Sequence, residues 1–388
     1  MVPVSYSVRN LMVRRTTTAA TALGIGLVVF VFASVLMLGA GLQRAMGRSG
    51  SADVAIVLRA GSDAESSSGI ELPAAALVTA SPEVRVRPDG RSDAVGEVVG
   101  VLALDRAGGE GMSNVQVRGV PDDVYRFRPS VHVVAGRAAA PGSDEVVVGA
   151  AIRGRFRGVE LGQSFEIKKN RMVRVVGVFE DRGSSFESEV WGDIDTVRAA
   201  FGREALVSSV RVRLRSAGQL DAFKRAIETN PQLGLTVKRE SVYYEELAQG
   251  TTTFLTILGL MIAFFFSAGA MIGAMITMHA SVAQRSREIG TLRALGFSRR
   301  SILASFLFES VVLSLAGGVA GALASLAMGL VRFNIVNFAT WSEVVFTFVP
   351  TPSIVVSSLL FAALMGLLGG FFPAVRAARM NVLDALRA

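Results

Sequence analysis

Residues 284–301 read QRSREIGTLRALGFSRRS and carry five arginines and one glutamate between two long runs that are almost free of charge. The hydrocarbon core of a membrane does not accept that density of charge on one helix. A segment that separates two apolar runs and is itself basic and partly apolar is typical of a loop at a membrane surface. The stretch therefore predicts a membrane protein with a short structured loop between two spans.

Four apolar runs are long enough to cross a bilayer, which takes about 18 or more residues. They lie at residues 19–42, 254–283, 302–331 and 353–375. A single charge, Glu309, interrupts the third run, and the other runs have none. The first run is far longer than the roughly 7–15 apolar residues of a secretory signal, so we expect a retained anchor.

The composition agrees with a membrane protein. Hydrophobic residues make up 51% of the 388 residues, and the mean hydropathy is +0.47. The absence of cysteine excludes disulfides and thiol chemistry. The basic excess of +8 is nearly all arginine, with only four lysines; this bias is typical of a high-GC genome rather than of a binding patch, so we expect no nucleic-acid partner.

The placement of the arginines predicts the orientation, because cytoplasmic loops carry an excess of basic residues. Basic clusters precede the first run, separate the second from the third, and follow the fourth: Arg9, Arg14, Arg15; Arg285, Arg287, Arg293, Arg299, Arg300; Arg376, Arg379, Arg387. Both termini and the basic loop are therefore expected in the cytoplasm. Residues 43–250 are expected outside.

The segment 43–250 has the pattern of a mixed α+β domain. Strands are predicted where β-branched residues alternate, at 53–58, 84–87, 114–120, 144–149, 164–169, 172–180 and 208–215. Helices are predicted at 72–80, 151–157, 194–202 and 218–230. Asp195 and Ser216 are the expected start signals of the last two helices, and Gly202 is an expected stop signal.

No catalytic motif is visible. No lysine follows a glycine, so the chain has no G-x-x-x-x-G-K-[ST] loop for ATP. We find no nucleophile elbow and no H-E-x-x-H pair. No cofactor is expected on this chain, and we expect it not to be an enzyme by itself.

The basic loop fits a helix over residues 287–295. Ile289, Leu292 and Leu295 then fall on one arc, and Gly296 is placed to end the helix. A helix of this kind either lies in the lipid headgroups or docks into a cytoplasmic partner, and its composition does not separate the two.

Two further features belong to the spans. Glycine pairs at a spacing of four predict close helix packing: Gly269 and Gly273, Gly317 and Gly321, Gly366 and Gly370. Glu309 is the one firm intramembrane ionisable group, and we expect it to pair with a polar group rather than to relay protons.

The run REIGTLRALGFSRRSI closely resembles the cytoplasmic loop of MacB/FtsX-type (type VII) ABC transporter permeases. Three other stretches resemble the same family: SVRNLMVRRTTTAATALGIG at the start, FESVVLSLAGGVAG around Glu309, and PAVRAARMNVLDALR at the end. Val382 stands where a proline is frequent in the terminal signature. The resemblance implies the four-span form without a fused ATPase.

The resemblance also implies roles and partners. The coupling residues carried over are Arg287, Glu288, Ile289, Gly290, Leu292, Arg293, Leu295 and Gly296. The implied partners are an ABC ATPase dimer, which would hold the ATP, a second permease copy in a homodimer or heterodimer, and a periplasmic adaptor or lipoprotein. The implied location is the bacterial inner membrane.

The resemblance leaves the function open between two classes. In both, mechanotransmission is implied, in which ATP-driven motion of the ATPase moves the outside domain. One class is efflux or export through an adaptor and an outer-membrane channel. The other is extraction or trafficking of a lipid or lipoprotein, or activation of an extracytoplasmic hydrolase. A membrane-anchored sensor without an ATPase would not need the docking helix.

The predicted layout has nine parts. They are an amphipathic N-terminal helix at 1–18, spans at 19–42, 251–283, 301–331 and 353–375, the outside domain at 43–250, the coupling loop at 284–300, a short outside loop at 332–352 and a cytoplasmic tail at 376–388.

Overall fold

The computed structural model describes residues 15–109 and 111–381, which form two compact units. We call residues 15–40, 254–331 and 347–381 the membrane unit, and residues 41–253 with 332–346 the inserted domain. Most of the predicted N-terminal helix at 1–18 and the end of the predicted tail lie outside the described residues.

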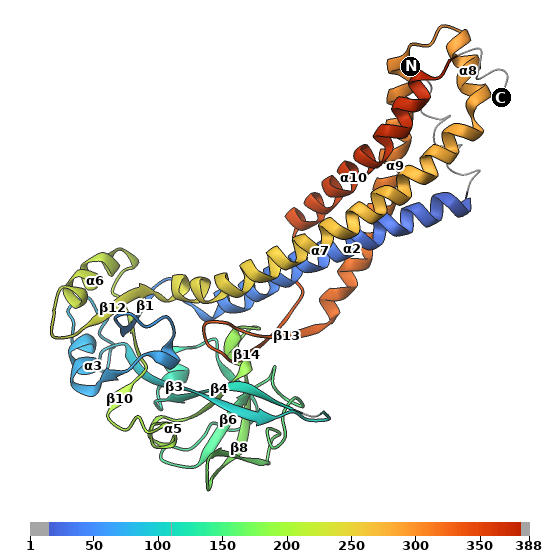
Figure 1. The fold of residues 1–388 in the computed structure, drawn as a ribbon. Coiled ribbons are helices and arrows are strands. Elements are labelled where there is room, and N and C mark those ends of the chain that lie inside the picture. The colour runs from blue at the N-terminus through green and yellow to red at the C-terminus, as the bar shows by residue number, and fades with distance from the viewer. Residues whose placement is uncertain (1–14, 110, 382–388) are drawn as a thin grey trace. The chain divides into compact units, whose positions relative to one another are not determined.

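The membrane unit contains the four long helices that the apolar runs predict (Figure 1). They are α2 (Arg15–Ser49), α7 (Glu240–Gln284), α9 (Arg299–Leu326, continued by η4, Ala327–Leu330) and α10 (Pro352–Arg379). Two of them have clear start signals: the Ser298 hydroxyl caps α9, and the Thr351 hydroxyl caps α10 ahead of Pro352. Both α2 and α7 continue past their apolar runs into the residues of the inserted domain, which the apolar runs alone did not predict.

The inserted domain is built on a ten-stranded mixed sheet. The order along the sheet is β12 (Leu235–Arg239), β1 (Val54–Arg59), β11 (Ser209–Arg213), β3 (Ala94–Asp105), β4 (Met112–Val120), β9 (Glu189–Asp193), β6 (Glu145–Gly149), β8 (Arg171–Glu180) and β5 (His132–Gly136), with β7 (Ser164–Lys168) also paired to β8. The pairs β4–β9 and β6–β8 are parallel, and the other pairs are antiparallel.

Short helices and two small hairpins complete this domain. The helices are α3 (Leu72–Thr79), α4 (Val124–Phe127), α5 (Ile194–Phe201) and α6 (Leu220–Glu228), with 3₁₀ turns η1 (Glu65–Ser67), η2 (Ser185–Ser188) and η3 (Ala217–Gln219). The two-stranded sheets are β2 (Ile70–Glu71) with β10 (Leu206–Val207), and β13 (Arg332–Val336) with β14 (Glu343–Thr347). The hydrophobic core joins valines of the sheet to Phe223 and Ile227 of α6.

Two predicted elements are wrong. The stretch 84–87 forms no strand; Val84 pairs with Leu214 and Val86 with Ser92 in isolated bridges only. The stretch 151–157 is a series of turns, with Ile152 and Phe156 buried in the core. Its apolar residues do reach the interior, but Gly154 has a φ of +69°, which a regular helix does not allow.

The two predicted start signals of α5 and α6 are wrong, and the predicted stop signal of α5 is confirmed. The Asp193 carboxylate caps α5 by accepting from the backbone N–H groups of Asp195 and Thr196, so the predicted cap at Asp195 is two residues late. Ser216 precedes η3 instead of α6 and forms no side-chain cap. Gly202 ends α5 in the left-handed region, with a φ of +66°.

Candidate functional site

The basic loop contains a nine-residue helix, α8 (Ser286–Ala294), which differs from the predicted helix by one residue at each end. The end of α8 has the two hydrogen bonds of a Schellman motif: Phe297 N donates to Leu292 O, and Gly296 N donates to Arg293 O. Gly296 has a φ of +93°, so the glycine is where the predicted cap requires it.

The predicted apolar arc of this helix is divided in the structure. Ile289 is only 2% exposed and packs against Met278, Val282 and Ile302 of the membrane unit. Leu295 is 72% exposed, because α8 ends at Ala294 and the chain turns after it. Ile289 therefore anchors α8 to its own bundle, and its side chain is not exposed on the surface of α8.

The remaining predicted coupling residues differ in exposure. Arg287 and Glu288 are exposed, and Leu292 and Arg293 are partly buried. Gly290 is buried, and Gly296 is exposed beside Leu295. The apolar side chain that this loop offers most fully to a partner is therefore Leu295.

Glu309 in α9 is paired within the bundle. Its Oε2 atom accepts a hydrogen bond of 2.9 Å from Nη1 of Arg285, the residue that precedes α8. The same guanidinium lies over the ring of Phe306, 5.1 Å from its centroid. Because Glu309 is 4% exposed, this pair ties the start of α8 to α9 at a position where an unpaired carboxylate would be costly.

Glycine pairs in α9 and α10 bring helices into close contact. A Cβ atom at Gly317 would collide with the carbonyl oxygen of Ala22 in α2, and one at Gly321 with the carbonyl oxygen of Gly26. Gly366 and Gly370 of α10 are packed in the same way against serines of α9: Ser314 and Ser310. These two predicted packing pairs are present as expected.

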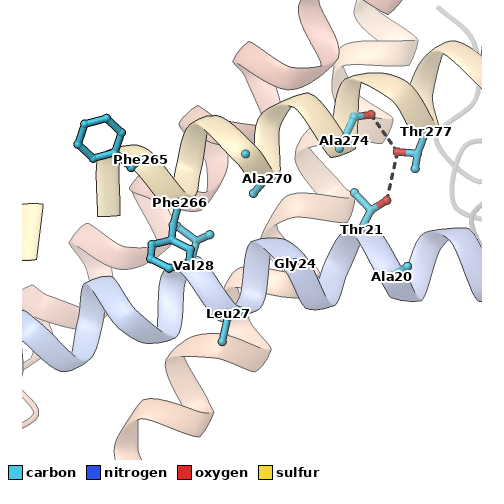
Figure 2. A pocket seen from close by; sticks show the side chains of 12 residues that line it. Ala20, Thr21, Gly24, Leu27, Val28, Phe265, Phe266, Ala270, Ala274 and Thr277 are labelled. Carbon is cyan, nitrogen blue, oxygen red and sulfur yellow. Dashed lines mark hydrogen bonds between the residues drawn. The ribbon is translucent and has the colours of Figure 1, made fainter. Parts of the chain in front are cut away.

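The third pair differs. Apart from the backbone of its own helix and its chain neighbours, no described atom lies within 4 Å of the position that a Cβ would take at Gly269 or Gly273. Both glycines line an open apolar groove of about 590 Å³ between α2 and α7 (Figure 2). Hydrogen bonds from Thr21 Oγ to Thr277 Oγ and from Thr277 Oγ to Ala274 O lie at one end of the groove. This pair therefore does not pack helices within the described chain.

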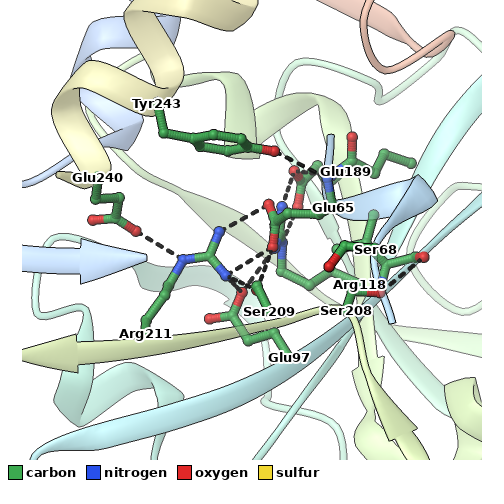
Figure 3. Close-up of polar contacts among 12 residues, drawn as sticks. Glu65, Ser68, Glu97, Arg118, Glu189, Ser208, Ser209, Arg211, Glu240 and Tyr243 are labelled. Carbon is green, nitrogen blue, oxygen red and sulfur yellow. Dashed lines mark hydrogen bonds and ion pairs between the residues drawn. The ribbon is translucent and has the colours of Figure 1, made fainter. Parts of the chain in front are cut away.

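The inserted domain contains a buried ionic cluster that joins its sheet to the first turn of α7 (Figure 3). Three arginines and four glutamates form it: Arg118, Arg128, Arg211, Glu65, Glu97, Glu189 and Glu240. They come from η1, from the segment after α4, from the adjacent strands β11, β3, β4 and β9, and from α7. All seven side chains are buried.

Arg211 connects most members of this ionic cluster. Its Nε atom donates to Glu240, Nη1 donates to Glu65 and Glu97, and Nη2 donates again to Glu65, all at 2.8 Å. Arg118 pairs in a similar way with Glu97 and with both oxygens of Glu189. Each guanidinium thus uses its forked donors on more than one carboxylate.

The electrostatics of the ionic cluster follow from burial and pairing. Burial alone would raise the pKa of Glu65, but the guanidinium groups of Arg118 and Arg211 hold that pKa below its ordinary value. The pKa of Glu97 is lowered for the same reason. Burial dominates at Glu189 and raises the pKa of that carboxyl above its ordinary value, despite its bonds from Arg118.

Comparison with protein families decides what kind of chain this is. Residues 18–230 match the family model described as a MacB-like periplasmic core domain, and this match covers more than half of the chain. Residues 260–382 match the model described as an FtsX-like permease C-terminal domain. The chain belongs to the MacB/FtsX family of ABC transporter permeases.

Two curated relatives show how far the similarity extends. The permease is 31% identical over 224 residues to "Macrolide export ATP-binding/permease protein MacB" of Pectobacterium atrosepticum, which covers 55% of this chain and 33% of the relative. It is 32% identical over 225 residues to "Uncharacterized ABC transporter permease YknZ" of Bacillus subtilis, covering 55% and 54%. The match thus spans a third to about half of the relatives' length.

Among solved structures, the periplasmic region of MacB from Actinobacillus actinomycetemcomitans is similar to this permease. It covers 50% of this chain and 92% of its own, with a TM-score of 0.37 and 12% identity.

The loop between the third and fourth spans of the permease also belongs to the inserted domain. Glu343 of β14 is almost fully buried, and its carboxylate accepts from Arg106, Arg155 and the Ser113 hydroxyl. Asn337 Nδ2 donates to Leu247 O. The predicted short loop at 332–352 is therefore a hairpin bound to the domain that precedes it.

Sequence reasoning missed these groups in the permease. The residue types of the ionic cluster are visible in SVRVR (209–213), where Ser209, Arg211 and Arg213 alternate with valines. Alternation shows that these polar residues share one face, but it does not show that η1 and α7 cover that face. No group of three or more His, Asp or Glu among the described residues is arranged to hold a metal ion.

Proposed function

We propose that this permease transmits the motion of a separate ATPase to its inserted domain and that it works in export from the cell. The observation that carries the proposal is α7, a single helix from Glu240 in the ionic cluster to Gln284 next to α8. At 1.5 Å per residue, its 45 residues give a lever about 68 Å long. A long helix that is fixed at both ends is suited to carry displacement.

The end of α7 next to α8 is the input in this proposal. Ile289 packs α8 against the bundle, and the Arg285–Glu309 pair ties its start to α9. A push on α8 would therefore move α7 and α9 rather than be absorbed by a loose loop. The exposed Leu295 supports docking into an apolar site on the ATPase.

The output end is Glu240. Its carboxylate accepts from Arg128, Arg211 and the backbone N–H of Ser51. The first turn of α7 is thus bound to β11, to the segment after α4 and to the end of α2. In this proposal the domain follows α7 because removing one partner of a buried ion pair costs about 3–5 kcal/mol.

A second copy of the permease belongs to this proposal. The span in α7 is 17% buried within the described chain, against 39–44% for the other three spans. The apolar groove with Gly269 and Gly273 lies on the same helix. Small residues and open apolar surface on one span favour association with another helix, which we assign to the second copy.

Export is favoured by the names of the MacB relatives, which describe macrolide export. In the proposed orientation, both termini and α8 lie in the cytoplasm and the inserted domain lies outside, as the arginine clusters indicate. The adaptor and the outer-membrane channel are part of the same proposal.

The docking step is tested with Leu295→Asp, using co-purification with the co-expressed ATPase and the ATP turnover of the complex. Leu77→Asp in α3 is the matched control, because Leu77 is 60% exposed and is proposed to lie on the other side of the membrane. We expect Leu295→Asp to weaken ATPase binding at least tenfold, a change of about 1.4 kcal/mol. Normal co-purification and turnover of this variant, at normal expression, would remove the docking proposal.

A further inference from the structure

The inserted domain has a polar pocket at the place where α2 ends and α7 begins. The pocket has a volume of about 350 Å³. Four arginines and two carboxylates line it: Arg48, Arg128, Arg182, Arg213, Asp181 and Glu240. It therefore has an excess of positive charge.

Two of the arginines are available to a ligand. Arg48 and Arg182 are exposed, and neither forms an ion pair with any residue that the structure describes. Nη1 of Arg48 donates to the carbonyl oxygen of Arg182, so the two residues are held next to each other. Guanidinium groups that are brought together without carboxylates favour an anion between them.

A third arginine supplies an unused donor from the interior. Arg128 is 6% exposed, and Nη2 of its guanidinium binds Glu97 and Glu240. Its Nε atom is buried without a hydrogen-bond partner among the described residues. A buried N–H that lacks a partner is unfavourable, and a ligand or an ordered water in the pocket would relieve it only by a local adjustment.

The other charged groups of the pocket are already engaged. Arg213 is paired with Asp53 and Asp93. Glu240 belongs to the ionic cluster, and Asp181 Oδ2 accepts from the Ser184 hydroxyl. A neutral hydroxyl does not offset the carboxylate of Asp181, so the charge left for a ligand is that of Arg48, Arg182 and part of Arg128, less that of Asp181.

The loop that carries Arg182 is held in a strained conformation. Arg182 has a φ of +53°, which is uncommon for a residue with a side chain. The Glu187 carboxylate keeps the turn in place by accepting from the backbone N–H groups of Asp181 and Gly183. Strain of this kind persists where surrounding contacts enforce it, and it clusters at ligand-binding sites.

We propose that this pocket binds a phosphate ester through Arg48, Arg182 and Arg128. Arginine forks match the geometry of phosphate oxygens, and the volume leaves room for an organic group on the phosphate. Arg48 follows Leu42, the end of the first apolar run, by six residues on α2, or about 9 Å of helix. A phospholipid headgroup and a soluble phosphate ester are the two sources of this chemistry.

The test uses the full chain in a neutral detergent and follows its melting temperature during titration with two probes. Short-chain phosphatidic acid represents the lipid source, and glycerol 3-phosphate represents the soluble source. A ligand that binds the folded state raises the melting temperature with concentration, which gives an apparent Kd. The variants are the double substitution Arg48→Gln, Arg182→Gln and the control Arg44→Gln.

Arg44 is a stringent control because it is exposed on the same helix, one turn before Arg48, and it does not line the pocket. We expect one probe to bind the wild-type chain and the Arg44→Gln variant equally, and the double variant at least tenfold more weakly. The probe that shows this pattern identifies the source. Binding of neither probe to the wild type, equal binding to the double variant, or an equal loss in Arg44→Gln would overturn the proposal.

Discussion

The membrane unit and the inserted domain solve the packing of their interiors in opposite ways. Helices of the membrane unit approach through glycines, with the Gly317 and Gly321 backbones against α2, and α8 is joined to α9 by the buried pair Arg285–Glu309. The inserted domain places three arginines and four glutamates at the junction of its sheet with α7. Contact between backbones needs only shape, whereas a buried ionic cluster needs every partner.

This difference predicts that the two units respond to different substitutions. In the membrane unit, adding one methyl group at a packed glycine is expected to be harmful. In the inserted domain, removing one charge from the ionic cluster is expected to be harmful even if the volume is kept.

The largest effect is expected from Arg118→Met, which leaves Glu189 without its guanidinium partner and removes one of the partners of Glu97. We expect it to lower the free energy of unfolding of the inserted domain by about 3–5 kcal/mol, measured by denaturant unfolding of the full chain in detergent. Arg85→Met is the control, because Arg85 is half exposed and its pair with Asp93 is expected to contribute less than about 1 kcal/mol. Equal losses in the two variants would contradict the special role of the buried ionic cluster.

Smaller effects on the stability of the membrane unit, opposite in sign, are expected from alanine at two glycines. Gly317→Ala places a methyl group against the Ala22 carbonyl and is expected to destabilise the membrane unit by about 1–3 kcal/mol. Gly269→Ala has open space around it within the single chain and is expected to be neutral or stabilising by up to about 1 kcal/mol in the monomer, since alanine favours helix. Retention in solution after heating of the detergent-solubilised chain measures both. If both variants changed heat stability equally, the close backbone contact at Gly317 would not be the cause of the loss.

Acid pH is expected to weaken the inserted domain by a few degrees in melting temperature. The pKa values of Glu65 and Glu97 in the folded chain lie below their ordinary value of 4.5, so their contribution is full above about pH 4.5 and is lost as the pH falls through the folded values. Glu189 acts in the opposite direction, because its raised pKa contributes stability at low pH that is lost as the pH rises. A Glu97→Gln variant should therefore show a flatter decline below pH 4.5 than the wild type, and an equally steep decline would refute this source of acid sensitivity.

The smallest effect is expected from Glu309→Gln, which removes the charge but keeps an acceptor for Arg285. A loss of about 1 kcal/mol in the membrane unit is expected, from the difference between a charged and a neutral hydrogen bond. Glu288→Gln is the control, since the Glu288 side chain is about half exposed in its contact with the same arginine. If Glu288→Gln were the more damaging of the two, the stabilising contact of Arg285 would be the one with Glu288 in α8 and not the one with Glu309 in α9.

Local signals were sufficient for many elements of this chain. Long apolar runs with at most one charge predicted all four spans, because a bilayer requires continuous apolar helix. Gly296 and Gly202 predicted two helix ends, since both residues adopt positive φ values that disfavour other side chains. Alternating apolar residues, most of them valines, predicted β1, β4, β6, β7, β8 and β11, because the period of two is a property of the strand itself.

Long-range contacts decided the rest. Ile289 and Leu295 look equivalent in sequence, but only the position of α7 and α9 buries the first, and only the end of α8 exposes the second. Gly269 and Gly317 have the same spacing motif, yet a neighbouring backbone is present at one and absent among the described residues at the other. Arg211 alternates with valines as a solvent-exposed residue would, and its burial depends on Glu65 and Glu240, which lie 146 and 29 residues away. A sequence pattern fixes which residues share a face, whereas the cover over that face comes from distant segments, and this is why the tertiary structure was needed to find the ionic cluster and the arginine pocket.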